Sequence, residues 1–266
     1  MVVLLRYSYT TLITFSAKVS DHAFALRCVP MQTPAQRLIW QHLTVLPACP
    51  VASSVDAFGS VVSTGFLGRR HSLFAYEAAG LVETTDQPVT DAPFPFYSHP
   101  SPLTMPSPEM SSIANSLGSP ADDPALWTER LMAAVASRLS YSPGATSVDT
   151  TAAQALELGQ GVCQDFAHVS VAIARLAGLP ARYACGFMEG EGASHAWVEV
   201  FINGRWLPID PTNQRPAVNS YIKLAHGRDF DDCSISRGVF RGQASQAVSV
   251  SVDVWKANQA DADSCH

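Results

Sequence analysis

One short turn constrains the C-terminal half of this chain more than any other feature. Asn203-Gly204 is the strongest two-residue signal for a β-hairpin, and it separates two strand-like runs, 195–202 and 205–210. When these runs pair outward from the turn, His195 and Asp210 become diagonal neighbours on one face of the hairpin. Diagonal neighbours lie about 7–8 Å apart at the backbone, a gap that an imidazole and a carboxylate can close. The sequence therefore predicts a His–Asp hydrogen bond.

A cysteine stands where a helix is expected to begin. The irregular stretch 159–162 leads into an apolar-periodic run that starts at Cys163 and stops at Gly178. Unpaired backbone N–H groups and the positive end of the helix dipole stabilise a thiolate at such a position. A nearby imidazolium lowers the pKa of a thiol further below its free value of roughly 8.5. Cys163 is thus a candidate nucleophile, with His195 as its base and Asp210 as the group that orients the base.

Four ordered blocks of sequence carry a resemblance to a known family. They are Gly161–Ala167, Ala174–Arg182, His195–Val200 and Trp206–Asn213. At these blocks the chain resembles the transglutaminase-like branch of the papain-like cysteine enzymes, in particular bacterial transglutaminase-like proteins described as cysteine proteases. The resemblance implies that Cys163, His195 and Asp210 occupy the family's catalytic positions. It leaves the substrate open, because the superfamily includes cross-linking transferases, proteases, amidases and non-catalytic scaffolds.

Composition and charge limit the possible partners. The chain has 266 residues, 47% hydrophobic and 15% charged, which is typical of a globular protein of one large or two modest domains. The net charge is −6 and no basic run is present, so we expect no nucleic-acid partner. The first residues lack a basic segment and a small-residue cleavage site, and no apolar run reaches membrane-spanning length. These features predict a cytoplasmic protein with no membrane partner; the oligomeric state is open.

The cysteines and acidic residues do not form a recognisable metal site or disulfide framework. Six cysteines are scattered widely, at Cys28, Cys49, Cys163, Cys185, Cys233 and Cys265. A metal hydrolase would recruit Cys163, His168, Cys185 or His195, but no pair has the close spacing of zinc ligands. The acidic run 229–232 lacks the glycine and terminal glutamate of a calcium loop. We therefore expect reduced thiols, and no cofactor or metal.

The chain divides into four predicted regions. Residues 1–85 contain short strand signals and predict an N-terminal β-sandwich, similar to the domain that accompanies bacterial transglutaminase-like domains. The Pro- and Ser-rich stretch 86–120 is expected to be a linker or a wrapped connection. Residues 121–242 predict a transglutaminase-like α+β catalytic domain, with the Cys163 helix against an antiparallel sheet, and 243–266 a C-terminal strand and tail. Within the catalytic domain, the glycine-rich stretch 189–194 is expected to be either a mobile gate or a solvated loop.

The predicted chemistry is acyl transfer through a thioester. Cys163 attacks the carbonyl of a peptide, isopeptide or amide substrate, His195 protonates the leaving amine, and water then resolves the thioester. This makes the protein a peptidase or amidase; a protein-glutamine transamidase, which uses an amine in place of water, and a non-catalytic scaffold are the alternatives. The backbone N–H of Cys163 is expected to stabilise the oxyanion. Further candidates for oxyanion stabilisation or substrate binding are Gln154, Gln160, Tyr183 and Trp197, of which Trp197 could also shield the His195–Asp210 pair from water.

Overall fold

One long strand organises the N-terminal half of the computed structural model, which describes residues 2–258. The strand is β1 (Val3–Val29), and its residues from Leu5 to Phe15 are buried at every second position, as expected for a strand with one face in a core. Its first half pairs with β5 (His71–Thr84) and β15 (Gln246–Lys256), and its second half with β4 (Val61–Leu67) and β14 (Ser236–Arg241). Between the halves the register shifts, and Asp21 adopts a left-handed φ of 49°.

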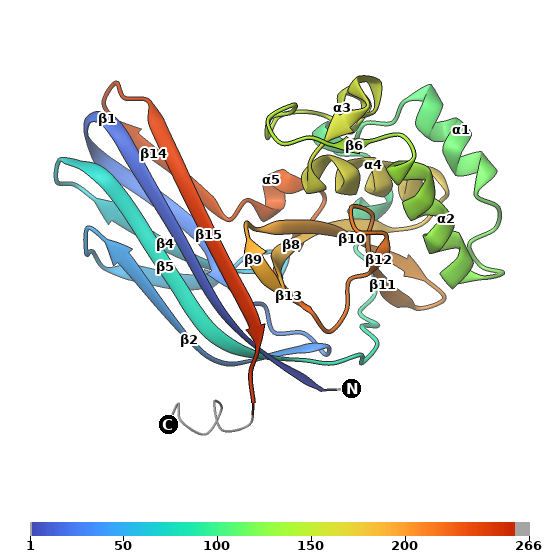
Figure 1. The fold of residues 1–266 in the computed structure, drawn as a ribbon, viewed down its shortest axis with the longest axis horizontal. Helices are drawn as coiled ribbons and strands as arrows, with labels where there is room; N and C mark the ends of the chain where they lie inside the picture. The colour runs from blue at the N-terminus through green and yellow to red at the C-terminus, as the bar shows by residue number, and fades with distance from the viewer. Residues whose placement is uncertain (1, 259–266) are drawn as a thin grey trace.

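The two halves of β1 carry the two facing layers of the N-terminal part. β2 (Gln36–Leu46) extends the first layer beside β5, and β3 (Val51–Val55) extends the second beside β4. Residues of both layers share one apolar core, for example Tyr7 from the first and Phe24 from the second. The predicted strand-rich N-terminal region is confirmed (Figure 1).

The C-terminal half is an α+β domain, as predicted. Its helices are α2 (Pro124–Ala136), α3 (Ala152–Leu158), α4 (Cys163–Leu176) and the short α5 (Phe230–Cys233). Its main sheet has the order β12 (Arg215–Pro216), β11 (Arg205–Asp210), β10 (His195–Ile202), β8 (Ala181–Met188) and β13 (Tyr221–Gly227). A two-residue parallel pair, β6 (Ser140–Tyr141) with β7 (Gln160–Gly161), precedes α4. The apolar face of α4 packs on β8 and β10 and forms the core of this domain.

The hairpin has the predicted register. Asn203 and Gly204 have φ values of 50° and 78°, the two positive angles that a type I′ turn requires. Ile202 pairs with Arg205, and the pairing continues to Val198 with Ile209. The turn therefore determines which face of the sheet each hairpin residue occupies.

The Pro- and Ser-rich stretch 86–120 is packed against the α+β domain. It contains two short 3-10 helices, η1 (Pro95–Ser98) and η2 (Pro102–Thr104), and the helix α1 (Pro108–Ser116). Tyr97 and Met110 are buried. The Arg175 guanidinium of α4 donates hydrogen bonds to the Tyr97 carbonyl at 3.0 Å and to Thr104 Oγ1 at 2.8 Å. The stretch thus has the wrapped form of the two expected, because it supplies polar acceptors to a buried arginine.

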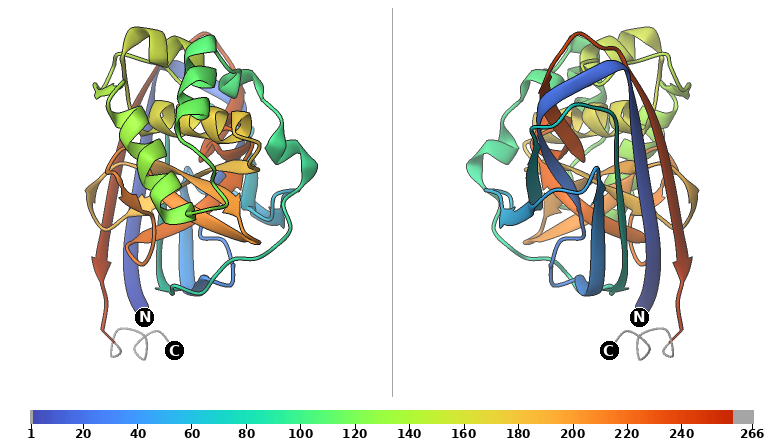
Figure 2. Two further views of the ribbon diagram at one scale, coloured as in Figure 1. Left: turned by 90° about the vertical axis from the view of Figure 1, so that its right-hand side faces the viewer. Right: turned by 90° about the vertical axis from the view of Figure 1, so that its left-hand side faces the viewer.

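The two halves are joined by strands as well as by a shared core. After the α+β domain, β14 and β15 return to the N-terminal sheet, and Figure 2 shows β15 in red beside β1 in blue. Phe187 and Ile222 of the α+β domain's main sheet belong to the N-terminal core. The predicted C-terminal strand is β15, whereas 259–266, the predicted tail, lie outside the described residues.

The glycine-rich stretch before His195 is paired in this structure. β9 (Gly190–Gly192) forms an antiparallel ladder with Val252–Val254 of β15. Gly190 and Gly192 have φ values of 120° and 155°, which side chains other than glycine rarely adopt. The stretch expected as a gate or a solvated loop is therefore an edge strand that continues the N-terminal sheet to within three residues of His195.

Candidate active site

Cys163 is the first residue of α4, and the turn that precedes it is held by Asp165. The Asp165 carboxylate accepts hydrogen bonds from the Val162 backbone N–H at 2.8 Å and from Thr146 Oγ1 at 2.7 Å. A Cβ on Gly161 would lie 2.6 Å from the Asp165 side chain, so only glycine fits there. Cys163 is partly exposed at this fixed helix start, where backbone N–H groups are unpaired. The placement agrees with the sequence prediction.

His195 is the first residue of β10 and forms a short hydrogen bond with Asp210. Its Nε2 lies 2.7 Å from Asp210 Oδ2, which leaves Nδ1 as the nitrogen available to Cys163. Burial of the ring disfavours the charged imidazolium, but hydrogen bonds with Asp210 and with Cys163 outweigh it and raise the pKa of His195 to about 9. The ring is therefore charged at neutral pH.

Asp210 is fully buried and is saturated with hydrogen-bond donors. Besides the His195 ring, its Oδ2 accepts from Asn213 Nδ2 and from the Tyr221 hydroxyl, both at 2.7 Å. Its Oδ1 accepts from the backbone N–H groups of Thr212 at 2.9 Å and Asn213 at 3.1 Å. Burial disfavours the carboxylate, but the His195, Asn213 and Tyr221 contacts lower the pKa of Asp210 to about 2. The carboxylate is thus ionised and fixed in orientation.

Sequence reasoning missed the two side chains that help His195 hold this carboxylate. Asn213 follows Asp210 by three residues, and a turn in which an Asp side chain accepts from the next backbone N–H groups is a local signal that could have found it. Tyr221 comes from β13, and no local pattern links it to Asp210. Arg215 donates to the Tyr221 hydroxyl at 2.9 Å, so the hydroxyl is oriented toward the carboxylate.

The four additional candidates lie in different places. Trp197 is buried and contacts Tyr221 edge to face, with ring centroids 5.5 Å apart, so it supports a residue that holds Asp210. Tyr183 is buried in β8 beside the ring of His168. Gln160 is exposed on β7, directly before the α4 start. The Gln154 amide oxygen accepts from the Thr151 backbone N–H at 2.9 Å, so it caps α3.

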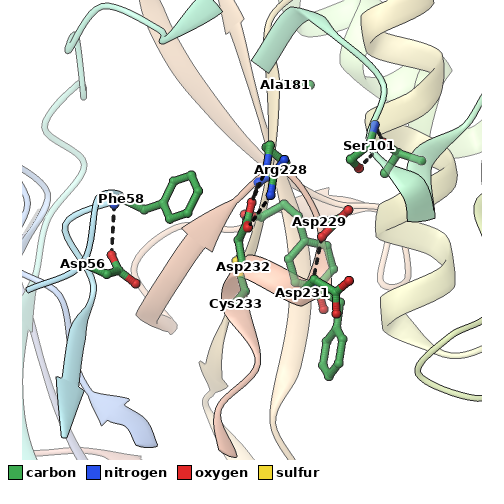
Figure 3. Close-up of polar contacts among 12 residues, drawn as sticks. Asp56, Phe58, Ser101, Ala181, Arg228, Asp229, Asp231, Asp232 and Cys233 are labelled. Carbon is green, nitrogen blue, oxygen red and sulfur yellow. Dashed lines mark hydrogen bonds and ion pairs between the residues drawn. The ribbon is translucent and has the colours of Figure 1, made fainter. Parts of the chain in front are cut away.

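The acidic run 229–232 is occupied by protein contacts. Figure 3 shows Asp232 turned toward Arg228, whose backbone N–H and Nε both donate to Asp232 Oδ2 at 2.8 Å. It also shows Asp229 accepting from the Asp231 backbone N–H. Asp231 pairs with Arg237 at 2.6 Å. Within residues 2–258, no group of three or more His, Cys, Asp or Glu side chains is arranged to hold a metal ion. In the same range, no helix is long and apolar enough to cross a membrane.

Comparisons with known proteins agree with this architecture. A family model of the transglutaminase-like superfamily matches residues 111–211, and a model of the bacterial transglutaminase-like N-terminal region matches residues 5–83. An uncharacterized protein of Mycobacterium leprae is 26% identical over 255 residues, covering 86% of this chain and 90% of its own length. An uncharacterized protein of Mycobacterium tuberculosis is 27% identical over 267 residues, covering 85% of this chain and 84% of its own length.

A solved structure shows the same fold over nearly the whole chain. It is that of a "Putative Cysteine Protease" from Cytophaga hutchinsonii, with a TM-score of 0.76 and 20% identity. The alignment covers 97% of this chain and 94% of the other. The arrangement of both halves, including the N-terminal strands, is therefore shared with that protein.

Proposed function

We propose that this chain, a bacterial-type member of the transglutaminase-like superfamily, is a cysteine-dependent acyl hydrolase that acts on peptide, isopeptide or amide bonds. The observation that carries the proposal is the His195–Asp210 hydrogen bond of 2.7 Å beside the helix start that presents Cys163. A nucleophile, a base and a group that orients the base are the parts of a thiol triad.

The first half-reaction forms a thioester. The Cys163 thiolate adds to the substrate carbonyl carbon, and the negative charge moves to the carbonyl oxygen. The Cys163 backbone N–H at the α4 start is placed to donate to this oxyanion, a contribution typically worth about two to three orders of magnitude in rate. The His195 imidazolium then gives its proton to the departing amine, the C–N bond breaks, and the acyl group remains on Cys163 as a thioester.

The second half-reaction releases the acid. Neutral His195 takes a proton from water as the water oxygen adds to the thioester, and the C–S bond breaks. The products are a free carboxylic acid and Cys163 as a thiolate beside a charged His195 ring. Asp210 supports both steps, because its hydrogen bond to Nε2 fixes the ring with Nδ1 toward the sulfur.

Resolution by water is proposed over resolution by an amine. An acceptor amine must outcompete water at roughly 55 M, which requires a pocket that excludes solvent and holds the amine. Two structural features favour access by water: Cys163 is partly exposed, and Tyr141, whose backbone pairs with Gly161 beside it, is 59% exposed. Transamidation of protein glutamine remains the second candidate function.

A peptide and isopeptide library tests both parts of the proposal. Wild-type protein should release free-acid product, while Cys163→Ala and His195→Ala should not. Millimolar primary amine should leave the free acid as the main product. Dominant amine incorporation would identify a transamidase, and turnover by Cys163→Ala would remove the thiol mechanism altogether.

The proposed location is the cytoplasm. Five cysteines, Cys28, Cys49, Cys163, Cys185 and Cys233, are free thiols within residues 2–258. Reduced thiols are the usual state in the cytoplasm, where glutathione and thioredoxin act. Fractionation of cells that produce the full-length protein would test this, and recovery from an extracytoplasmic fraction would contradict it.

A further inference from the structure

A cavity of about 240 Å³ lies between the two layers of the N-terminal part, well separated in sequence from the triad. Its lining residues come from β1, β5, β14 and β15. Tyr9, Phe74, Tyr76 and Phe240 supply aromatic rings, and Thr11, Ser236, Arg237 and Gln246 are polar. An apolar cavity of about 150 Å³ can bind benzene, so this one has room for a substituted ring.

Two valines on the rim of the cavity are uncovered, beside the polar side chains of Arg237 and Gln246. Thr11 pairs with Val250 and Ile13 with Val248, and directly opposed residues share a face of a sheet. Because Thr11 and Ile13 are buried in the interior, the two valines face the interior too. Val248 is nevertheless 58% exposed and Val250 38% exposed. The cavity therefore opens to solvent past these two inward-facing valines, which a ligand with an apolar body would cover.

A buried histidine supplies the cavity with a hydrogen-bond acceptor. His71 Nδ1 lies 3.0 Å from the Arg69 carbonyl oxygen, which can only accept, so this nitrogen carries the proton. With its proton on Nδ1, a neutral His71 ring has its acceptor at Nε2, which lies 3.2 Å from His22 Nδ1. His22 Nδ1 must therefore be the donor of this hydrogen bond. In the neutral His22 ring, the remaining nitrogen, Nε2, is then an acceptor. Burial and the neighbouring His71 lower the pKa of His22, which favours this neutral state.

Gly238 exposes that acceptor to the cavity. A Cβ at position 238 would lie 2.8 Å from His22 Nε2, so the glycine keeps the space beside this ring nitrogen free of a side chain, and both residues line the cavity. Within residues 2–258, only the Nδ1 atom of His22 has a protein hydrogen-bond partner. The His22 ring is packed against Phe15, Phe74 and Phe240 and cannot easily turn away.

From these contacts we propose that the N-terminal part binds a small phenol in this cavity, with the ring between the aromatic walls and the hydroxyl donating to His22 Nε2. Aromatic walls favour an aromatic ring in edge-to-face or offset contact. The Nε2 atom of His22 selects a donor, and the buried Thr11 Oγ1, which has no hydrogen-bond partner, offers the same cavity a hydroxyl. A neutral imidazole cannot stabilise a carboxylate as a charged one would. This site is independent of the thiol chemistry.

Phenol and toluene form a matched pair of probes, because they have nearly the same shape and differ in the hydroxyl. Without recognition of the hydroxyl, toluene should bind more tightly, since a methyl group is more hydrophobic. The proposal predicts the reverse order in nuclear magnetic resonance titrations of the full-length protein at pH 8. Gly238→Ala, which fills the space before His22 Nε2, should weaken phenol binding by about tenfold or more. Val239→Ala, a control on the outward face of the same strand, should leave it unchanged.

Tighter binding of toluene than phenol, absence of phenol binding, or full binding by Gly238→Ala would each overturn the proposal. If Gly238→Ala does not fold, the nitrogen-15 chemical shift of His22 Nε2 in the wild-type protein provides the same test. It should move on addition of phenol and stay in place on addition of toluene.

Discussion

At the scale of single residues, Asp210 is the group on which the proposed site depends. Five donor groups from four residues converge on its two oxygens, so the carboxylate has one orientation and the His195 ring follows it. Sequence reasoning located His195 and Asp210 through the hairpin turn. It could not find Tyr221, because the position of β13 relative to β11 is determined only by the packing of the whole sheet.

Replacing Asp210 by Asn tests the orienting role. The amide N–H group of Asn would face His195, Asn213 or Tyr221, which all donate to Asp210 Oδ2 in this structure. It would therefore favour the wrong tautomer of His195. In a comparable serine triad this change lowers turnover on the order of 10⁴-fold, and a thiolate–imidazolium pair should lose less. Turnover of the best library substrate measures the effect, with the half-exposed Asp231→Asn as control. Full activity of Asp210→Asn would exclude the triad role.

The raised pKa of His195 predicts a pH-dependent stability. The folded-state pKa of about 9 lies above the ordinary value of 6.5. The stabilisation that the charged His195 ring gives the folded state is therefore fully present below pH 6.5 and is lost as the pH rises through 9. The free energy of unfolding should fall by up to about 3 kcal/mol over this interval. Urea titrations at several pH values should give a flatter curve for His195→Gln, which cannot titrate there. Parallel curves would show that the ring is not charged in the folded protein.

At the scale of elements, local sequence signals were sufficient wherever the structure depends on neighbours in the chain. The Asn203-Gly204 turn determined the hairpin register, and the apolar period placed Cys163 at the start of α4. Composition left two forms open where long-range contacts decide. The stretch 86–120 is rich in proline and serine, yet its carbonyl and hydroxyl oxygens satisfy the buried Arg175.

Gly204 offers a test at the scale of elements. No neighbouring atom lies within 4 Å of a Cβ placed on Gly204, so a substitution there is opposed by the left-handed φ of 78° and not by a steric clash. Gly204→Val should lower the free energy of unfolding by about 1–2 kcal/mol, the cost of a left-handed conformation for a side-chain-bearing residue. Gly204→Asn should lose clearly less, since Asn tolerates this region. Chemical denaturation of both variants measures the difference, and equal losses would mean that the turn conformation is not what matters.

At the scale of the whole molecule, the two halves share a sheet and a core. β14 and β15 complete the N-terminal sheet, and Phe187 and Ile222 complete its core. The sequence predicts a strand-rich N-terminal region followed by an α+β domain, and the structure has both. It could not show that the last strands return to the first sheet, since strand partners far apart in sequence leave no local pattern.

This architecture predicts a single unfolding transition. Tryptophan fluorescence and far-ultraviolet circular dichroism should give coincident urea curves, because neither half can bury its apolar surface alone. Residues 86–234 produced without β1 to β5, β14 and β15 should not fold. Separate transitions, or a first proteolytic cut within 86–120 that releases two stable fragments, would show two independent domains.

The most direct test of the central claim, that Cys163 is an activated nucleophile, needs no substrate. Cys28 and Cys233 are buried, which raises the pKa of each thiol, and Cys185 is buried as well. Substoichiometric iodoacetamide near neutral pH, followed by peptide mass spectrometry, should therefore label Cys163 well before the other cysteines. A Cys265→Ala background removes the cysteine outside the described residues, and His195→Ala should slow the labelling of Cys163. Equal labelling of all cysteines, or protection of Cys163 in the folded protein, would contradict the account.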